Sequence, residues 1–320
     1  MRTGSSIRRD PTVKSNAELV SSFRANFISH STSLTNGTGH DSSPPTPKRS
    51  NYRSWTHMAD DGRRELEIPK IDFETSGLQE EREQYDITLK LFYLPGAPTD
   101  KREVQTREAV KLVLKELHVP SIDLLIISFP GIYFDEEEDC PDKISTRGPV
   151  EADPEPLDSQ LATWKTLEAL HDEGIVKKLG IAEFGHDRLQ DFLESARIKP
   201  SVDQINLRDC CSVPRNLLKL AKSSGVELLV HNDCSNILPR GTVRELLGPG
   251  EGGAGVLAEP TKTGEKRKSL NGEESRQNGD VSDGLRGEVQ PLWVVKYTAV
   301  VKNRGVVENK GYFAVAELVD

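Results

Sequence analysis

Residues Ile122-Asp-Leu-Leu-Ile-Ile-Ser-Phe129 form an almost wholly apolar run. A short apolar run of this kind is typical of a strand in a parallel sheet that is covered on both faces. The preceding stretch, 103–118, carries Val110, Val113 and Leu117 at helical spacing. Strand and helix patterns then alternate along the chain, which indicates an α/β fold made of parallel strand-helix units.

The alternation predicts the individual elements. We expect strands at 86–93, 122–129, 179–184, 202–207, 226–230 and around 306–307, and helices at 103–118, 157–171, 187–196, 214–224, 242–247 and 292–304. Six such units in parallel order, with one uncertain strand near 66–68, predict a (β/α)8 TIM-barrel-like fold that could be incomplete. A doubly wound open sheet is the competitor, but no Gly-rich dinucleotide turn follows any strand.

Composition divides the chain into four parts. Residues 1–62 are expected to form a mostly disordered leader, with one short amphipathic helix around residues 19–28 that docks on the body. Residues 63–247 would form the barrel, and the polar stretch 248–290, rich in Gly, Glu and Lys, a disordered insertion. Residues 291–320 would supply the last helix-strand unit, which completes the barrel.

Charge and cysteine content exclude several classes of protein. The 42 basic and 51 acidic residues give a net charge of −9, which disfavours nucleic acid or an anionic membrane as partner. Apolar runs are far shorter than the 18 or so residues that a membrane helix requires. Four cysteines do not suggest a secreted disulfide framework, so we expect a cytoplasmic protein.

Three strand motifs occur in order: Asp123-Leu-Leu-Ile-Ile-Ser-Phe-Pro130, Leu179-Gly-Ile-Ala-Glu-Phe184 and Val202-Asp-Gln-Ile-Asn206. They resemble the histidine-bearing strand, the Gly-Val-Ser-Asn-Phe strand and the Val-Asp-Gln strand of aldo-keto reductases. The resemblance implies a barrel that reduces carbonyls with NADPH, using a Tyr general acid together with Lys, Asp and His.

The catalytic set that the resemblance implies is incomplete. Lys90 stands at the lysine position, but Ser128 stands at the histidine position. No Asp followed five residues later by Tyr precedes Lys90 at the end of a strand. We therefore treat Lys90 and Ser128 as vestigial and expect no catalytic residue.

The cofactor site is changed as well. The Ser-Asn pair that should hold the nicotinamide amide reads Ala182-Glu183, and His231 stands where a tyrosine should stack on the nicotinamide. Gln204 is retained. We expect no bound cofactor, with Gln204 as a vestige.

A longer resemblance rests on Pro291-Leu-Trp-Val-Val-Lys-Tyr-Thr-Ala-Val-Val-Lys-Asn-Arg-Gly-Val-Val-Glu-Asn-Lys-Gly-Tyr312, with Asp209-Cys-Cys-Ser-Val-Pro214 and His231-Asn-Asp233. These stretches resemble the modifier, or regulatory, subunits of glutamate-cysteine ligase, an aldo-keto-reductase-like family without reductase activity. The resemblance covers about residues 85–247 and 291–315. It implies a heterodimer with the catalytic ligase subunit, whose use of glutamate and feedback inhibition by glutathione this chain would tune. The alternative is an NADPH-dependent aldo-keto reductase with an atypical active site.

One cluster of candidate site residues lies at the carboxyl ends of neighbouring strands. A barrel would place Cys210 and Cys211 on the same rim as His231 and Cys234. A redox-responsive rim, a metal site and inert half-buried thiols all stay open, although the C-x-x-C spacing of zinc sites is missing and we expect no metal. The resemblance also suggests an intersubunit disulfide. Our candidates for partner binding or redox response are Cys210, Cys211, His231, Asn232, Asp233, Cys234, Lys302, Arg304 and Lys310.

Overall fold

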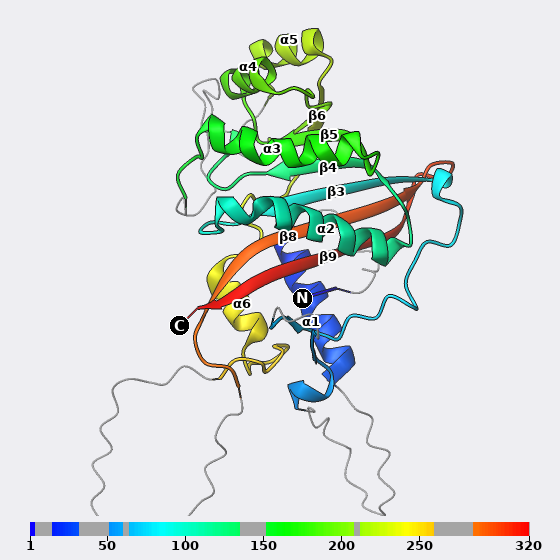
Figure 1. Cartoon of the computed structure of the whole chain (residues 1–320), viewed down its shortest axis with the longest axis vertical. Coiled ribbons are helices and arrows are strands. Elements are labelled where there is room, and N and C mark those ends of the chain that lie inside the picture. The colour runs from blue at the N-terminus through cyan, green and yellow to red at the C-terminus, as the bar shows by residue number, and fades with distance from the viewer. Residues whose placement is uncertain are drawn as a thin grey trace, which may run out of the picture.

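The computed structural model describes residues 1–3, 15–31, 51–59, 64–134, 152–207, 212–258 and 284–319 (Figure 1). Its centre is a seven-stranded sheet with the order β7-β6-β5-β4-β3-β8-β9. Five strands run parallel: β3 (Tyr85–Tyr93), β4 (Ile122–Ser128), β5 (Val176–Ala182), β6 (Val202–Ile205) and β7 (Glu227–Val230). Strand β8 (Glu288–Val301) pairs antiparallel with both β3 and β9 (Val306–Val319).

Helices cover both faces of this sheet. Those that connect the parallel strands are α2 (Arg102–Leu117), α3 (Leu157–Asp172), α4 (His186–Ser195) and α5 (Arg215–Ser224), and they cover one face (Figure 1). The other face is covered over β3, β8 and β9 by α1 (Ser15–Ser31) and α6 (Arg240–Leu247). The described elements also include the short 3-10 helices η1 (Tyr52–Ser54), η2 (Arg82–Gln84) and η3 (Thr99–Lys101).

Successive side chains of the long strands pack alternately into two separate hydrophobic cores. On β8, Trp293 and Val295 point into the core under α2 to α5, while Val294 between them points toward α1 and α6. Because successive side chains of a strand point to opposite faces, each long strand stabilises both layers. Full burial of each such side chain contributes roughly 1.5–3 kcal/mol.

The predicted parallel strand-helix units are confirmed between residues 85 and 247. Each expected strand and helix in this range is present, with bounds that shift by up to a few residues. The barrel is incomplete, because β7 and β9 end the sheet on its two sides within the described part of the chain. The uncertain strand near residues 66–68 is β2 (Leu66–Glu67), which pairs with β1 (His57–Met58) in a separate small sheet.

The prediction of a helix at 292–304 was wrong. This stretch is most of strand β8, so residues 291–320 form an antiparallel strand pair instead of a helix-strand unit. Apolar residues on both faces of a doubly covered strand satisfy helical spacing by chance. The Val, Tyr and Trp content favoured the strand, and the near-perfect pairing of β8 with β3 decides it.

Parts of the expected leader and of the expected insertion belong to the folded body. Within the expected leader, the docked helix around residues 19–28 is confirmed as α1, with Phe23 and Phe27 fully buried. The expected insertion was drawn too wide, because Val256 and Leu257 are buried and 288–290 begin β8. The remaining parts, including 32–50 and 259–283, lie outside the described residues.

Replacing Phe23 with Ala tests whether α1 belongs to the folded body. Phe23 is fully buried and stacks on Phe27, with 5.9 Å between ring centroids. We expect Phe23→Ala to lower the free energy of unfolding by about 3–5 kcal/mol, as for other buried phenylalanines. Ile28→Ala, at a half-exposed position of the same helix, should change it little. Urea denaturation of both variants is the measurement, and a native midpoint for Phe23→Ala would show that α1 contributes nothing to the fold.

Candidate functional site

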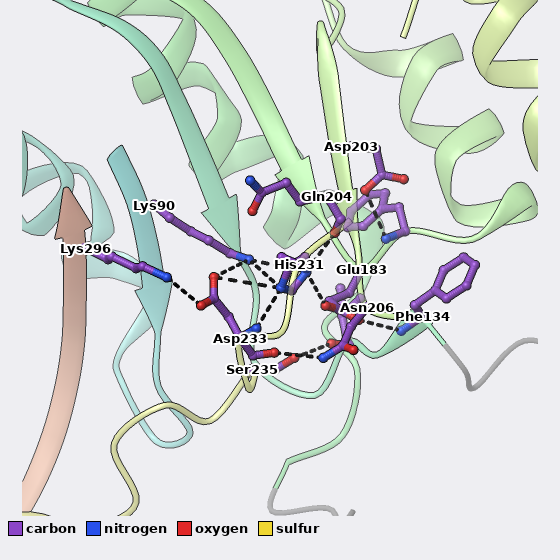
Figure 2. A network of polar contacts seen from close by, with 12 residues as sticks. Lys90, Phe134, Glu183, Asp203, Gln204, Asn206, His231, Asp233, Ser235 and Lys296 are labelled. Carbon is purple, nitrogen blue, oxygen red and sulfur yellow. Dashed lines mark hydrogen bonds and ion pairs between the residues drawn. The ribbon is translucent and has the colours of Figure 1, made fainter. Parts of the chain in front are cut away.

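The loop after β7 brings a buried carboxylate to Lys90 of β3 and Lys296 of β8. Asp233 lies in the loop between β7 and α6, and its carboxylate oxygens lie 3.3 Å from Lys90 Nζ and 2.7 Å from Lys296 Nζ. Lys90 and Lys296 face each other across the β3–β8 pair. Figure 2 shows both ammonium groups pointing toward the one carboxylate between them. Asp233 thereby joins the last parallel strand to the antiparallel half of the sheet.

A contact between a histidine and a carboxylate lies beside these ion pairs (Figure 2). The His231 Nε2 atom lies 2.7 Å from a carboxylate oxygen of Glu183, and Nδ1 accepts the Asp233 backbone N–H at 3.0 Å. Because Nδ1 accepts a hydrogen bond, Nε2 is the donor atom of the ring, and its hydrogen bond goes to the Gln204 carbonyl oxygen at 3.1 Å. The other Glu183 oxygen accepts the Phe134 backbone N–H at 3.1 Å.

Lys90, Glu183, His231, Asp233 and Lys296 form one ionic cluster. Burial and the neighbouring charges determine the pKa values of its members. Burial alone would raise the pKa of the Asp233 carboxyl, but the Lys90 and Lys296 ammonium groups, helped by His231, hold that pKa well below its usual range. Burial lowers the pKa of Lys90, and the carboxylates of Asp233 and Glu183 oppose that shift. Asp233 therefore stays ionised throughout the physiological pH range.

These contacts limit what the cluster can do chemically. A general acid or base must have a proton or lone pair that is free to reach substrate. Lys90 is 4% exposed and engaged with Asp233, and Ser128, at the histidine position, is 2% exposed. The ionic partners of Lys90 are side chains of this chain, so the cluster has the character of a structural ion-pair network.

The residues do not fit a nicotinamide. Glu183, at the position expected for the amide-binding asparagine, already binds the His231 ring and the Phe134 N–H. His231, at the position of the stacking tyrosine, has only 8% of its side chain exposed, and its Nε2 also lies 3.1 Å from the Gln204 carbonyl oxygen. A ring held in this way presents no free face for stacking.

The expected site residues are not all brought together. His231 and Asp233 lie in the cluster, Asn232 between them is exposed, and Cys234 is half-buried. Cys210 and Cys211 lie outside the described residues. The structure therefore describes His231 and Cys234 of the predicted rim and not its two adjacent cysteines. The redox response and the intersubunit disulfide stay predictions.

The three basic residues of the C-terminal block lie elsewhere. Lys302 and Arg304 follow β8 at the end where Val301 pairs with Tyr85, the start of β3. They pair there with Asp86 and Glu80. Lys310 Nζ lies 2.5 Å from Glu18 of α1. Because the cluster lies at the other ends of the parallel strands, these three residues are not part of it.

Sequence reasoning missed Lys296. The prediction of a helix over 292–304 separated this residue from Lys90, although it is the one charged side chain between Pro291 and Val301. A lone lysine in a Val-rich run is the signal that could have marked a strand with a buried ionic contact.

Within the described residues, no three His, Cys, Asp or Glu side chains are placed to hold a metal ion, and no helix is long and apolar enough to cross a bilayer.

Replacing Asp233 with Asn tests how much the ionic cluster contributes to the stability of the fold. The isosteric amide would leave two largely buried ammonium groups without their carboxylate, so we expect a loss of about 3–5 kcal/mol in unfolding free energy at neutral pH. The folded-state pKa of Asp233 is lowered, so its contribution is present above the unfolded pKa near 4 and is lost as pH falls below it.

Urea denaturation between pH 3 and pH 8 is the measurement. The difference in unfolding free energy between the native protein and Asp233→Asn should be largest near neutral pH and should decrease toward pH 3. Asp191→Asn, at an exposed position of α4, serves as the control. A gap that stays constant with pH would show that the carboxylate charge of Asp233 does not stabilise the fold.

Comparison with known proteins gives relatives of two kinds. The chain is 27% identical over 242 residues to a putative glutamate-cysteine ligase regulatory subunit of Schizosaccharomyces pombe, covering 73% of this chain and 72% of that protein. It is 27% identical over 238 residues to the glutamate-cysteine ligase regulatory subunit of Homo sapiens, covering 74% and 68%. Among solved structures, an aldose reductase from Schistosoma japonicum matches with 32% identity and a TM-score of 0.34, covering 46% of each chain, so the match spans less than half of that protein.

A family model describes the shared fold. The model of the aldo/keto reductase family matches residues 73–236, about half of the chain. This range holds β3 to β7, the helices between them and four members of the ionic cluster, Lys90, Glu183, His231 and Asp233. The chain therefore belongs to the aldo/keto reductase family.

Proposed function

We propose that this chain is a non-catalytic regulatory subunit that forms a heterodimer with the glutamate-cysteine ligase catalytic subunit in the cytoplasm. The observation that carries the proposal is the alignment of about three-quarters of the chain with proteins named glutamate-cysteine ligase regulatory subunits. That alignment, over 242 residues, is longer than the stretch 73–236 that the aldo/keto reductase family model matches.

The geometry of the ionic cluster supports the non-catalytic part of the proposal. In the reductases, the resemblance assigns the lysine the task of adjusting the pKa of a catalytic tyrosine. In this chain Asp233 lies against that lysine, and Lys296 of β8 lies across from it. The position next to Lys90 is taken by side chains that pair with each other, so the inherited acid-base machinery has become part of the scaffold.

A regulatory role then acts through the partner's conformations. The chain would lower the glutamate concentration that the catalytic subunit needs and weaken its inhibition by glutathione. It can do so only if it binds one conformational state of the partner better than another. Coupling free energies of this kind are about 1–3 kcal/mol, which corresponds to shifts of roughly 5–150-fold in affinity.

The ligase rate of the catalytic subunit, measured against glutamate concentration with and without this chain at fixed glutathione, tests the proposal. We expect a lower apparent KM for glutamate or weaker inhibition by glutathione, and a 1:1 complex on a sizing column. Unchanged kinetics together with no complex would contradict a regulatory role for this chain. Serum albumin at the same concentration controls for unspecific stabilisation of the catalytic subunit.

The reductase alternative is tested separately. Because Glu183 and His231 are engaged with each other, we expect no quenching of NADPH fluorescence and no aldehyde-dependent loss of NADPH absorbance. Aldehyde-dependent oxidation of NADPH that disappears in Lys90→Met would instead support a reductase with a rearranged site.

A further inference from the structure

Strand β7 is an open edge of the central sheet. The backbone N–H groups of Glu227 and His231 donate to Ser201 and Ile205 of the β6 side, at 2.9 and 3.1 Å. Because backbone groups alternate along a strand, the N–H and C=O groups of Leu228 and Val230 point away from β6. No hydrogen bond from the described residues reaches these outward groups, and the Val230 side chain is 62% exposed.

The opposite edge of the sheet is covered in its middle. Residues 1–3 pair antiparallel with β9 through the bridge between Arg2 and Phe313. The Thr3 N–H donates to the Tyr312 carbonyl at 2.9 Å, and the Ala314 N–H donates to the Met1 carbonyl at 2.9 Å. Exposed edges invite pairing with other chains, and proteins usually protect them. Within the described part of the chain, the edge at β7 lacks such a cover.

The helix next to this edge exposes cations and an apolar side chain together. Helix α5, which lies at one end of the molecule and packs against β7, carries Arg215, Lys219 and Lys222 on its exposed side (Figure 1). Their spacing of four and three residues places them on one stripe, together with the 47% exposed Leu218. No acidic residue lies on α5, and no ion pair with these three cations is found among the described residues.

The basic stripe and the open strand edge together indicate which kind of partner segment would bind there. The net charge of −9 disfavours an acidic partner for the chain as a whole, whereas the α5 stripe, on a helix without acidic residues, would attract one locally. An extended segment can pair with the outward groups of Leu228 and Val230 by strand addition, in which main-chain hydrogen bonds supply affinity. Acidic side chains on that segment would face α5.

We propose that the outer edge of β7, together with the α5 stripe of Arg215, Leu218, Lys219 and Lys222, is the docking surface for an extended acidic segment of the catalytic ligase subunit. The inference rests on the regulatory function proposed above and locates its interface. The surface adjoins the exposed Asn232 and the half-buried Cys234 of the predicted rim. It excludes Lys302, Arg304 and Lys310, which pair within this chain.

A proline at Val230 tests the strand addition. The Val230 N–H points away from β6, so Val230→Pro removes an outward donor and blocks the edge sterically while the β6–β7 bonds remain. We expect its affinity for the catalytic subunit, in a titration with the full chain, to fall at least about tenfold, and its unfolding midpoint to stay near native. Val230→Thr keeps the backbone groups and the branched shape, and should bind like the native chain. Should Val230→Pro fail to fold, Val230→Lys, which places a charge on the intact edge, takes its place.

Charge reversal tests the acidic character of the segment. The triple variant Arg215→Glu, Lys219→Glu, Lys222→Glu should bind at least about tenfold more weakly and lose most of the salt dependence of binding. The matched control, Lys101→Glu, Lys111→Glu, Lys165→Glu, makes an equal charge change at exposed positions of other elements and should bind within about twofold of native.

The outcomes separate the two proposals. If the native chain forms no complex with the catalytic subunit, the regulatory function fails and the docking surface with it. If the native chain binds and the edge variant binds equally well, the docking surface is overturned while the regulatory function stands. If the edge variant is weakened and the triple variant is not, strand addition holds and the acidic character of the segment is overturned.

Discussion

One buried carboxylate joins the two halves of this protein. Asp233 follows the last parallel strand, and its partners Lys90 and Lys296 lie on β3 and β8, four and five places along the sheet order. In a closed barrel, backbone hydrogen bonds would join the first and last strands. In the described residues of this chain the sheet is open. Ion pairs from the loop between β7 and α6 join its two halves, where a closed barrel would have backbone hydrogen bonds. A buried carboxylate of this kind is tolerated only because two cations compensate it.

The antiparallel strands β8 and β9 explain why the barrel stays open. Strand β8 pairs with the whole length of β3, from Tyr85 opposite Val301 to Tyr93 opposite Trp293. This occupies the side of β3 on which an earlier parallel strand would be needed for closure. The ring of Tyr297 on β8 lies over Gly311 of β9, where a Cβ atom would overlap it. The long pair also creates the second face on which α1 and α6 pack.

The contacts of the cluster also support the non-catalytic role proposed above. Lys90, at the lysine position, pairs with Asp233 of the loop after β7, and the positions expected to hold the nicotinamide form a histidine-glutamate pair. These contacts link the loop between β7 and α6 to β3, to β8 and to Glu183 after β5. In the regulatory function proposed above, this loop and the open strand edge beside it would serve to recognise another protein.

The sequence by itself determined the parallel half of the fold. Apolar runs such as 122–128 and helix faces such as that of α2 depend on local periodicity, which pattern reading captures. The missing reductase residues around Lys90 could likewise be read from single positions. What the tertiary structure decided is the state of 288–301, because a Val-rich segment buried on both faces carries no unambiguous period and becomes a strand only through its pairing with β3. For the same reason Lys296 entered the ionic cluster unforeseen: a contact between residues 63 positions apart, such as that between Asp233 and Lys296, depends on which strands are neighbours.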